Sequence, residues 1–76
     1  MMKMYKDFKT NLMLAILSYK IVNIYINQEK IVIGEGGVAK DFISFRPFGF
    51  YIKEHNSAKW YSYSNITKIE VYGHES

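Results

Sequence analysis

The sequence predicts a small, mostly β domain of the α+β class, with an N-terminal helix followed by a five-stranded, strongly bent antiparallel barrel of SH3-like or Sm-like type. Three observations predict this class. Apolar residues repeat with a helical period only in the first part of the chain, and beyond it they repeat with a period of two. Turn-forming residues then recur about every eight to twelve residues, which favours short strands. The length of 76 residues allows one domain, 1–76.

The helix is predicted over residues 4–17. An apolar stripe along it is formed by Phe8, Leu12, Ala15 and Ile16. Leu14 and Leu17 widen this stripe, so we expect the helix to pack closely on the rest of the chain. Lysines near the start of the helix lie on a different side, and Asp7 in the early turns suits the helix dipole.

The barrel is predicted over residues 19–72, with turn residues between its strands. The five strands are expected at 19–27, 30–34, 50–54, 59–63 and 66–72. A further short strand is left open at 42–45. The glycine-rich segment 34–37 predicts a bulge or a barrel corner after the second strand. Residues 73–76 are expected to form a frayed tail.

Composition limits how so short a chain can be stabilised. Its core is thin at this size, and it has no cysteine for disulfides. A dense apolar core or association with other copies must therefore support the fold. The aromatic content is 17% and includes seven tyrosines, a residue type favoured at interfaces. We therefore expect a homo-oligomer.

Nothing in the sequence predicts a catalytic centre. His55 and His74 fall in a predicted turn and tail, away from any nucleophile or second metal ligand. The glycines at 34–37 are not followed by a helix, as a phosphate-binding loop requires. We therefore expect a non-enzymatic protein with no cofactor, no metal and no small-molecule substrate. The longest apolar run, 12–17, is too short to span a bilayer, so a cytoplasmic protein without membrane association is expected.

Aromatic and basic residues crowd the second half of the chain. They are Phe42, Phe45, Arg46, Phe48, Phe50, Tyr51, Lys53, Lys59, Trp60, Tyr61 and Tyr63. Exposed rings on small barrels can stack nucleic-acid bases, and nearby cations can neutralise phosphates. The net charge of +3 suits such an anionic partner. Alternatively, alternate rings fill the core and the others cover the strand faces.

Several segments follow one another in an order that is typical of a known family. They are Phe8-Lys9-Thr10-Asn11-Leu12, Ile21-Val22-Asn23-Ile24-Tyr25-Ile26-Asn27, Lys30-Ile31-Val32-Ile33-Gly34, Phe50-Tyr51-Ile52-Lys53, Lys59-Trp60-Tyr61-Ser62-Tyr63 and Ser64-Asn65-Ile66-Thr67-Lys68-Ile69-Glu70-Val71. This order resembles the Sm-like family, which includes bacterial Hfq and the LSm proteins. The chain differs in having more residues between Gly34 and Phe50, and in having Tyr63-Ser64-Asn65 where Hfq has Tyr-Lys-His.

The resemblance implies a homo-oligomeric ring of about five to seven subunits, in which strand four of one copy pairs with strand five of the next. Single-stranded RNA would lie near the pore. The implied contacts are Lys40 and Phe42 before the third strand, and Tyr63, Ser64 and Asn65 before the fifth. Phe42 or Tyr63 would stack a base, Asn65 would hydrogen-bond its edge, and Lys40 would meet a phosphate. The alternative is that both rings belong to the core and that Asn65 caps a turn.

A second interpretation of the function comes from a different class of protein. The small size and the many aromatic residues suit a β-fold protein-interaction module equally well. Such a module could be a phage-type inhibitor that binds a host protein.

Overall fold

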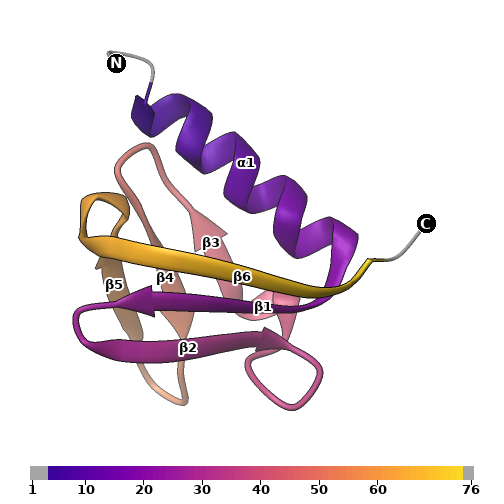
Figure 1. Cartoon of the computed structure of the whole chain (residues 1–76). Coiled ribbons are helices and arrows are strands. Elements are labelled where there is room, and N and C mark those ends of the chain that lie inside the picture. Colours follow the sequence, from indigo (N-terminus) through magenta and orange to yellow (C-terminus); the bar gives the residue numbers. More distant parts are fainter. Residues whose placement is uncertain (1–3, 75–76) are drawn as a thin grey trace.

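The described part of the chain, residues 4–74, folds into one helix and two three-stranded antiparallel sheets (Figure 1). The computed structural model describes the backbone of residues 4–74 and the side chains of residues 9–74. In chain order the elements are α1 (Met4–Ser18), β1 (Tyr19–Ile26), β2 (Glu29–Gly34), η1 (Lys40–Phe42), β3 (Ile43–Phe45), β4 (Gly49–Lys53), β5 (Ala58–Ser62), η2 (Tyr63–Asn65) and β6 (Ile66–His74), where η denotes a short 3₁₀ turn. The predicted mostly β class and the N-terminal helix are confirmed.

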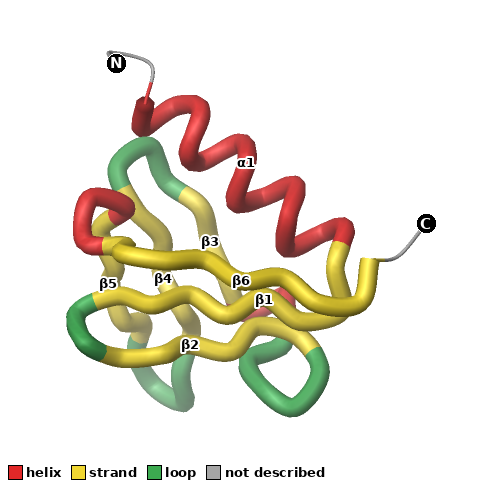
Figure 2. Tube along the Cα trace, viewed as in Figure 1, coloured by secondary structure: helices red, strands yellow, loops and turns green. Residues whose placement is uncertain are grey.

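The two sheets pack face to face and enclose the core between them. The first sheet has the strand order β2-β1-β6 and the second has the order β3-β4-β5. Figure 1 shows the second sheet behind the first with its strands crossing those in front, and Figure 2 shows α1 lying along one side of this pair of sheets. The predicted five-stranded barrel is wrong in two respects. Six strands are described instead of five, and within the described chain no strand pairing joins β2 to β3 or β5 to β6.

The glycine-rich segment after β2 explains why the barrel does not close. Gly34 and Gly36 have positive φ angles of 108° and 78°, so the chain leaves the strand in a tight loop. It then returns to β2, because the amide of Val38 donates to the carbonyl of Val32 at 2.8 Å and the amide of Gly34 donates to the carbonyl of Val38 at 2.7 Å. This loop occupies the edge of β2, so β3 does not pair with β2. β3 is the additional short strand that the sequence indicated as possible at residues 42–45.

The hairpin between β1 and β2 follows from its two turn residues. Asn27 and Gln28 both have positive φ angles, 53° and 64°, the combination that a two-residue type I′ turn requires. The turn pairs Ile26 directly with Glu29. The predicted alternation along β1 is also confirmed, because Val22, Ile24 and Ile26 are fully buried while the residues between them are half-buried.

The last strand is longer than the sequence predicts. β6 continues to His74 and pairs along β1, so residues 73 and 74 are not a frayed tail. Tyr19 and His74 are register partners whose rings meet edge to face, with centroids 4.9 Å apart. Residues 75–76 of the predicted tail lie outside the described residues.

One side of α1 completes the core. Leu12 and Ile16 are buried against the sheets, with 1% and 2% of their surface exposed. Leu14 and Leu17 do not widen this buried stripe as predicted, because they lie on the outer side of the helix with 55% and 66% exposed. The side chain of Phe8, which was predicted to belong to the stripe, lies outside the described side chains.

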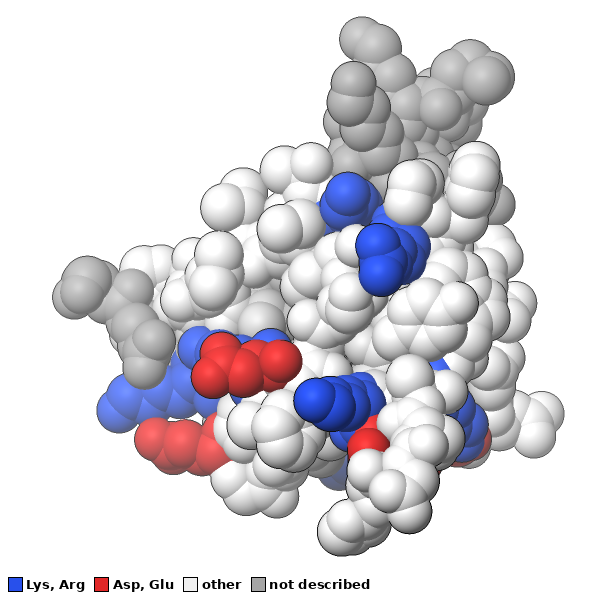
Figure 3. Space-filling model, turned by 180° about the vertical axis from the view of Figure 1, so that it is seen from behind, with Lys and Arg blue, Asp and Glu red and all other residues white. Residues whose placement is uncertain are grey.

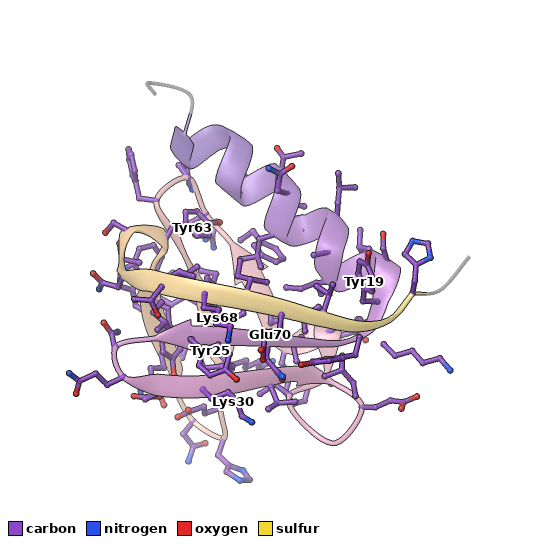
Figure 4. The ribbon with its side chains drawn as sticks, viewed as in Figure 1. Tyr19, Tyr25, Lys30, Tyr63, Lys68 and Glu70 are labelled. Carbon is purple, nitrogen blue, oxygen red and sulfur yellow. The ribbon has the colours of Figure 1, made fainter. Side chains whose placement is uncertain are left out.

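A polar network covers the middle of the outer face of the first sheet (Figure 4). The Tyr25 hydroxyl donates to the Glu70 carboxylate at 2.9 Å, and the Asn23 amide donates to the same oxygen at 3.5 Å. The Lys68 ammonium lies 3.1 Å from the other Glu70 oxygen and 5.3 Å from the centroid of the Tyr25 ring. The hydrogen bond from Tyr25, aided by the one from Lys68, lowers the pKa of Glu70 below its ordinary value.

This network makes the folding stability depend on pH. Because the pKa of Glu70 is lower in the folded chain, its carboxylate stabilises the fold above the ordinary glutamate pKa, and this contribution is lost as the pH falls through the folded pKa. We expect Glu70→Gln to lower the urea midpoint at pH 7, and the difference from the parent chain to shrink towards pH 3. Glu35→Gln, in the exposed glycine-rich loop, is the control and should leave the midpoint unchanged. A Glu70→Gln effect of equal size at both pH values would contradict the assignment.

Candidate nucleic-acid interface

The five residues implied as RNA contacts lie in the two 3₁₀ turns, at opposite ends of the second sheet. Lys40 and Phe42 belong to η1, which leads into β3 at the end where Ile43 pairs with Ile52. The other three residues, Tyr63, Ser64 and Asn65, belong to η2, which follows β5 at the end where Ser62 pairs with Gly49. The structure therefore keeps each group together but does not bring the two groups together within one subunit.

The ring of Tyr63 belongs to the core, which was the alternative to its role as a base-stacking ring. Only 1% of the residue is exposed, and its ring lies 6.1 Å from the ring of Phe50. Its hydroxyl donates to the carbonyl of Arg46 at 2.8 Å, which satisfies the buried oxygen. Burial raises the pKa of this hydroxyl above its ordinary value. In this structure Tyr63 therefore offers no free ring face to a base.

The other implied contacts are more accessible. Phe42 has 51% of its surface exposed, while Ser64 and Asn65 are exposed on η2. The residue that caps η2 is Ser62, whose hydroxyl accepts from the amide of Ser64 at 3.3 Å. Phe42 thus has the exposure that a base-stacking ring needs, and Asn65 is not needed as the cap of the turn.

The outer face of the second sheet carries the larger aromatic surface. Tyr51 on β4 and Trp60 on β5 are register partners, and their ring centroids lie 4.8 Å apart. They remain 37% and 42% exposed, whereas their neighbours Phe50 and Tyr61 point into the core. Both rings belong to the aromatic and basic set in the second half of the sequence, but the sequence alone did not place them together. The period of two with which side chains change face along a strand, applied to the predicted strands 50–54 and 59–63, is the signal that could have done so.

Gly49 gives the Trp60 ring its place on the sheet. A Cβ atom at Gly49 would lie 2.5 Å from Cζ2 of the indole, so only glycine leaves room for the ring at this point. The indole therefore lies directly against the backbone of β4, next to Tyr51. A ring held in this way loses little conformational freedom when a ligand stacks on it.

Two cations flank the paired rings. Arg46 follows β3 and Lys53 ends β4, and within the described chain neither side chain has an acidic partner. Figure 3 views the molecule from this side and shows blue side chains above and below an uncharged area, with acidic residues only in the lower half of the view. An open groove of about 620 Å³ lies on the Tyr51 side of the paired rings, and Ser44, Arg46 and Lys53 line it with Tyr51. We call this surface the aromatic face, defined by Ser44, Arg46, Tyr51, Lys53 and Trp60.

The aromatic face combines what single-stranded nucleic acid requires of a protein. Exposed rings supply stacking surfaces for bases, and cations beside them attract the phosphate backbone. Among the described residues no cluster of histidine and acidic side chains could hold a metal ion. The part of the chain that is described also contains no helix both long and apolar enough to cross a membrane.

Comparison of the chain with protein-family models, with curated proteins and with solved structures finds no match. The function of the chain must therefore be inferred from the geometry of the site itself.

Proposed function

We propose that this chain is a non-enzymatic, Sm-like, single-stranded RNA-binding protein that assembles into a homo-oligomeric ring in the cytoplasm. The observation that carries RNA binding is the aromatic face, where Tyr51 and Trp60 lie side by side and partly exposed between Arg46 and Lys53. Two adjacent rings can stack successive bases, and the flanking cations lie where the phosphates of the same strand would run. Phe42, next to this face, is a further stacking residue.

The free strand edges support assembly into a ring. In the described chain β5 pairs only with β4, and β6 pairs only with β1, so each has one edge without a strand partner. Unpaired edges of this kind favour pairing with another chain. If β5 of one copy adds to β6 of the next, the contact is head to tail, and a closed ring pairs the free edges of β5 and β6 in every copy. Rings of about five to seven subunits are those that the Sm-like resemblance implies.

Exposed apolar residues favour a second candidate, a protein-interaction module. Leu14 and Leu17 lie one turn apart on the outer side of α1 and are more than half exposed, far from the aromatic face. A double substitution of both leucines by glutamine separates the two functions. It would abolish partner binding by an interaction module and would leave RNA affinity unchanged in the function proposed here.

RNA binding is tested by fluorescence anisotropy with labelled single strands at several salt concentrations. We expect the association constant to fall as salt rises, with a logarithmic slope of about −0.7 for each phosphate that is neutralised. Double-stranded RNA of the same sequence is the control and should bind more weakly, because its bases are not free to stack on the rings. An affinity that does not change with salt, or the absence of binding, would contradict the proposal.

The ring is tested by light scattering and by cross-linking. The chain has no cysteine, so thiols can be introduced one at a time. Each double variant places one thiol on β5 and one on β6. The β5 substitution is Ala58→Cys or Ser62→Cys, and the β6 substitution is Lys68→Cys or Tyr72→Cys. After oxidation with diamide we expect at least one of these four variants to give a ladder of linked chains that ends at the ring size. Variants with one cysteine are the control, since they can give no more than dimers. A monomer by light scattering at every concentration would overturn the ring.

A further inference from the structure

A second hollow lies where the two sheets fail to close between β2 and the second sheet. Its volume is about 620 Å³, within the range of small-molecule and cofactor sites. Its walls are mostly apolar, and the residues that form them include Ile31, Val32, Val38, Ile52 and Tyr61. We call it the inter-sheet cleft. The cleft is present because the loop after Gly34 bonds to the edge of β2, so that β3 does not pair with this edge.

The inter-sheet cleft and the groove over the aromatic face meet at three residues. Phe42, Lys53 and Glu54 line both hollows, and together with His55 they also line a third hollow. Phe42 is half exposed at this junction, so its ring forms a wall between the aromatic face and the cleft. A strand lying on the aromatic face can therefore continue past Phe42 into the cleft without leaving the surface.

The charges at the cleft match a nucleotide. Lys30 and Lys53 line it, and neither ammonium has an ion-pair partner within the described chain. Glu54 lines the same hollow, and among the described residues its carboxylate has no hydrogen-bond or ion-pair partner. Ammonium groups suit a phosphate, whereas a carboxylate accepts only from a donor such as the exocyclic amino group of a base. The cleft thus combines an apolar interior with one anionic acceptor and two cations.

We propose that the inter-sheet cleft holds one nucleobase of the RNA strand bound on the aromatic face, and that Glu54 selects a base with an exocyclic amino group. The base inserts between the apolar walls with Phe42 at one side, and its amino group donates to the Glu54 carboxylate. Cytosine, adenine and guanine supply this donor, whereas uracil has no exocyclic amino group and presents carbonyl oxygens that the carboxylate repels. This inference rests on the proposed RNA-binding function and adds a base preference to it.

The test is anisotropy with labelled oligo(C), oligo(A) and oligo(U), each of about ten nucleotides. We expect the C and A strands to bind roughly 5- to 150-fold more tightly than the U strand, the range for one good base contact. Glu54→Gln should remove most of this difference, because an amide can also donate to the uracil carbonyl. Glu35→Gln, a carboxylate in the exposed loop outside the cleft, is the matched control and should preserve the difference.

The outcomes separate this inference from the function on which it rests. If none of the three strands binds, RNA binding fails and the base preference fails with it. If all three bind equally, or if Glu54→Gln leaves the difference unchanged, the aromatic face remains an RNA site but the cleft does not select a base. Because Glu54 is exposed, its substitution should leave the circular dichroism spectrum unchanged, and this is measured alongside. A fully retained preference in Phe42→Ala would show that the base does not enter past this ring, and would also overturn the inference.

Discussion

Phe50→Ala is expected to remove most of the folding stability of this chain. Phe50 is fully buried on β4, and its ring lies within 6.3 Å of the rings of Phe45, Tyr61 and Tyr63. Loss of a buried aromatic side chain costs about 3–5 kcal/mol, because transfer energy is lost and a cavity remains. A single core in a chain of this length rarely supplies more than about 3–5 kcal/mol in total. One substitution is therefore comparable to the whole free energy of unfolding.

The measurement is urea unfolding followed by circular dichroism. We expect Phe50→Ala to be largely unfolded without denaturant, or to have its midpoint close to zero urea. Phe42→Ala removes a ring of the same size from an exposed position and is the matched control, expected to change the free energy of unfolding by no more than about 0.5 kcal/mol. If Phe50→Ala lowered the free energy of unfolding by less than about 1 kcal/mol, the two sheets would not share the core described here.

Trp60→Ala is expected to weaken single-stranded RNA binding by roughly 5- to 150-fold. Stacking of a base on an aromatic side chain contributes about 1–3 kcal/mol, and the Trp60 indole is held against Gly49 beside Tyr51. Tyr51→Ala should have an effect of the same kind. The double variant should lose less binding free energy than the sum of the losses in the two single variants, because the rings contact each other.

Matched controls distinguish stacking from a general loss of surface. Tyr72→Ala removes an exposed ring from β6, on the first sheet, and should leave the RNA affinity unchanged. Trp60→Phe keeps a stacking surface and should retain part of the affinity. If Trp60→Ala and the parent chain had equal RNA affinities at the same salt concentration, the aromatic face would not be the RNA-binding site.

The elements that depend on local pattern could be predicted from the sequence. The period-two alternation of Val22, Ile24 and Ile26 predicts β1, since each of these residues must face the same side of a strand. The apolar repeat predicts α1 in the same way. The error at Leu14 and Leu17 arose because an apolar residue on a helix can remain exposed, and periodicity alone does not fix the width of the buried stripe.

The remaining features depend on contacts between distant segments. The glycines after β2 predict a bend, but the return of Val38 to the edge of β2 depends on backbone hydrogen bonds with Val32 and Gly34 that the sequence pattern does not reveal. The buried position of Tyr63 depends on a carbonyl 17 residues away, at Arg46. The aromatic face requires the register between β4 and β5, which places Tyr51 opposite Trp60. Composition alone could identify these rings without showing which of them share a surface.

The pairing of β1 with β6 has a consequence for synthesis in the cell. Of the strands that the structure describes, β1 is made first and β6 last, and their register joins Tyr19 to His74 across almost the whole described β region. Until β6 has left the ribosome, one edge of β1 lacks its strand partner. Contacts between such distant positions form slowly, because a long loop must close before they are made. Completion of the first sheet therefore has to wait until β6 has been synthesised, and removal of β6 would leave that edge of β1 uncovered permanently.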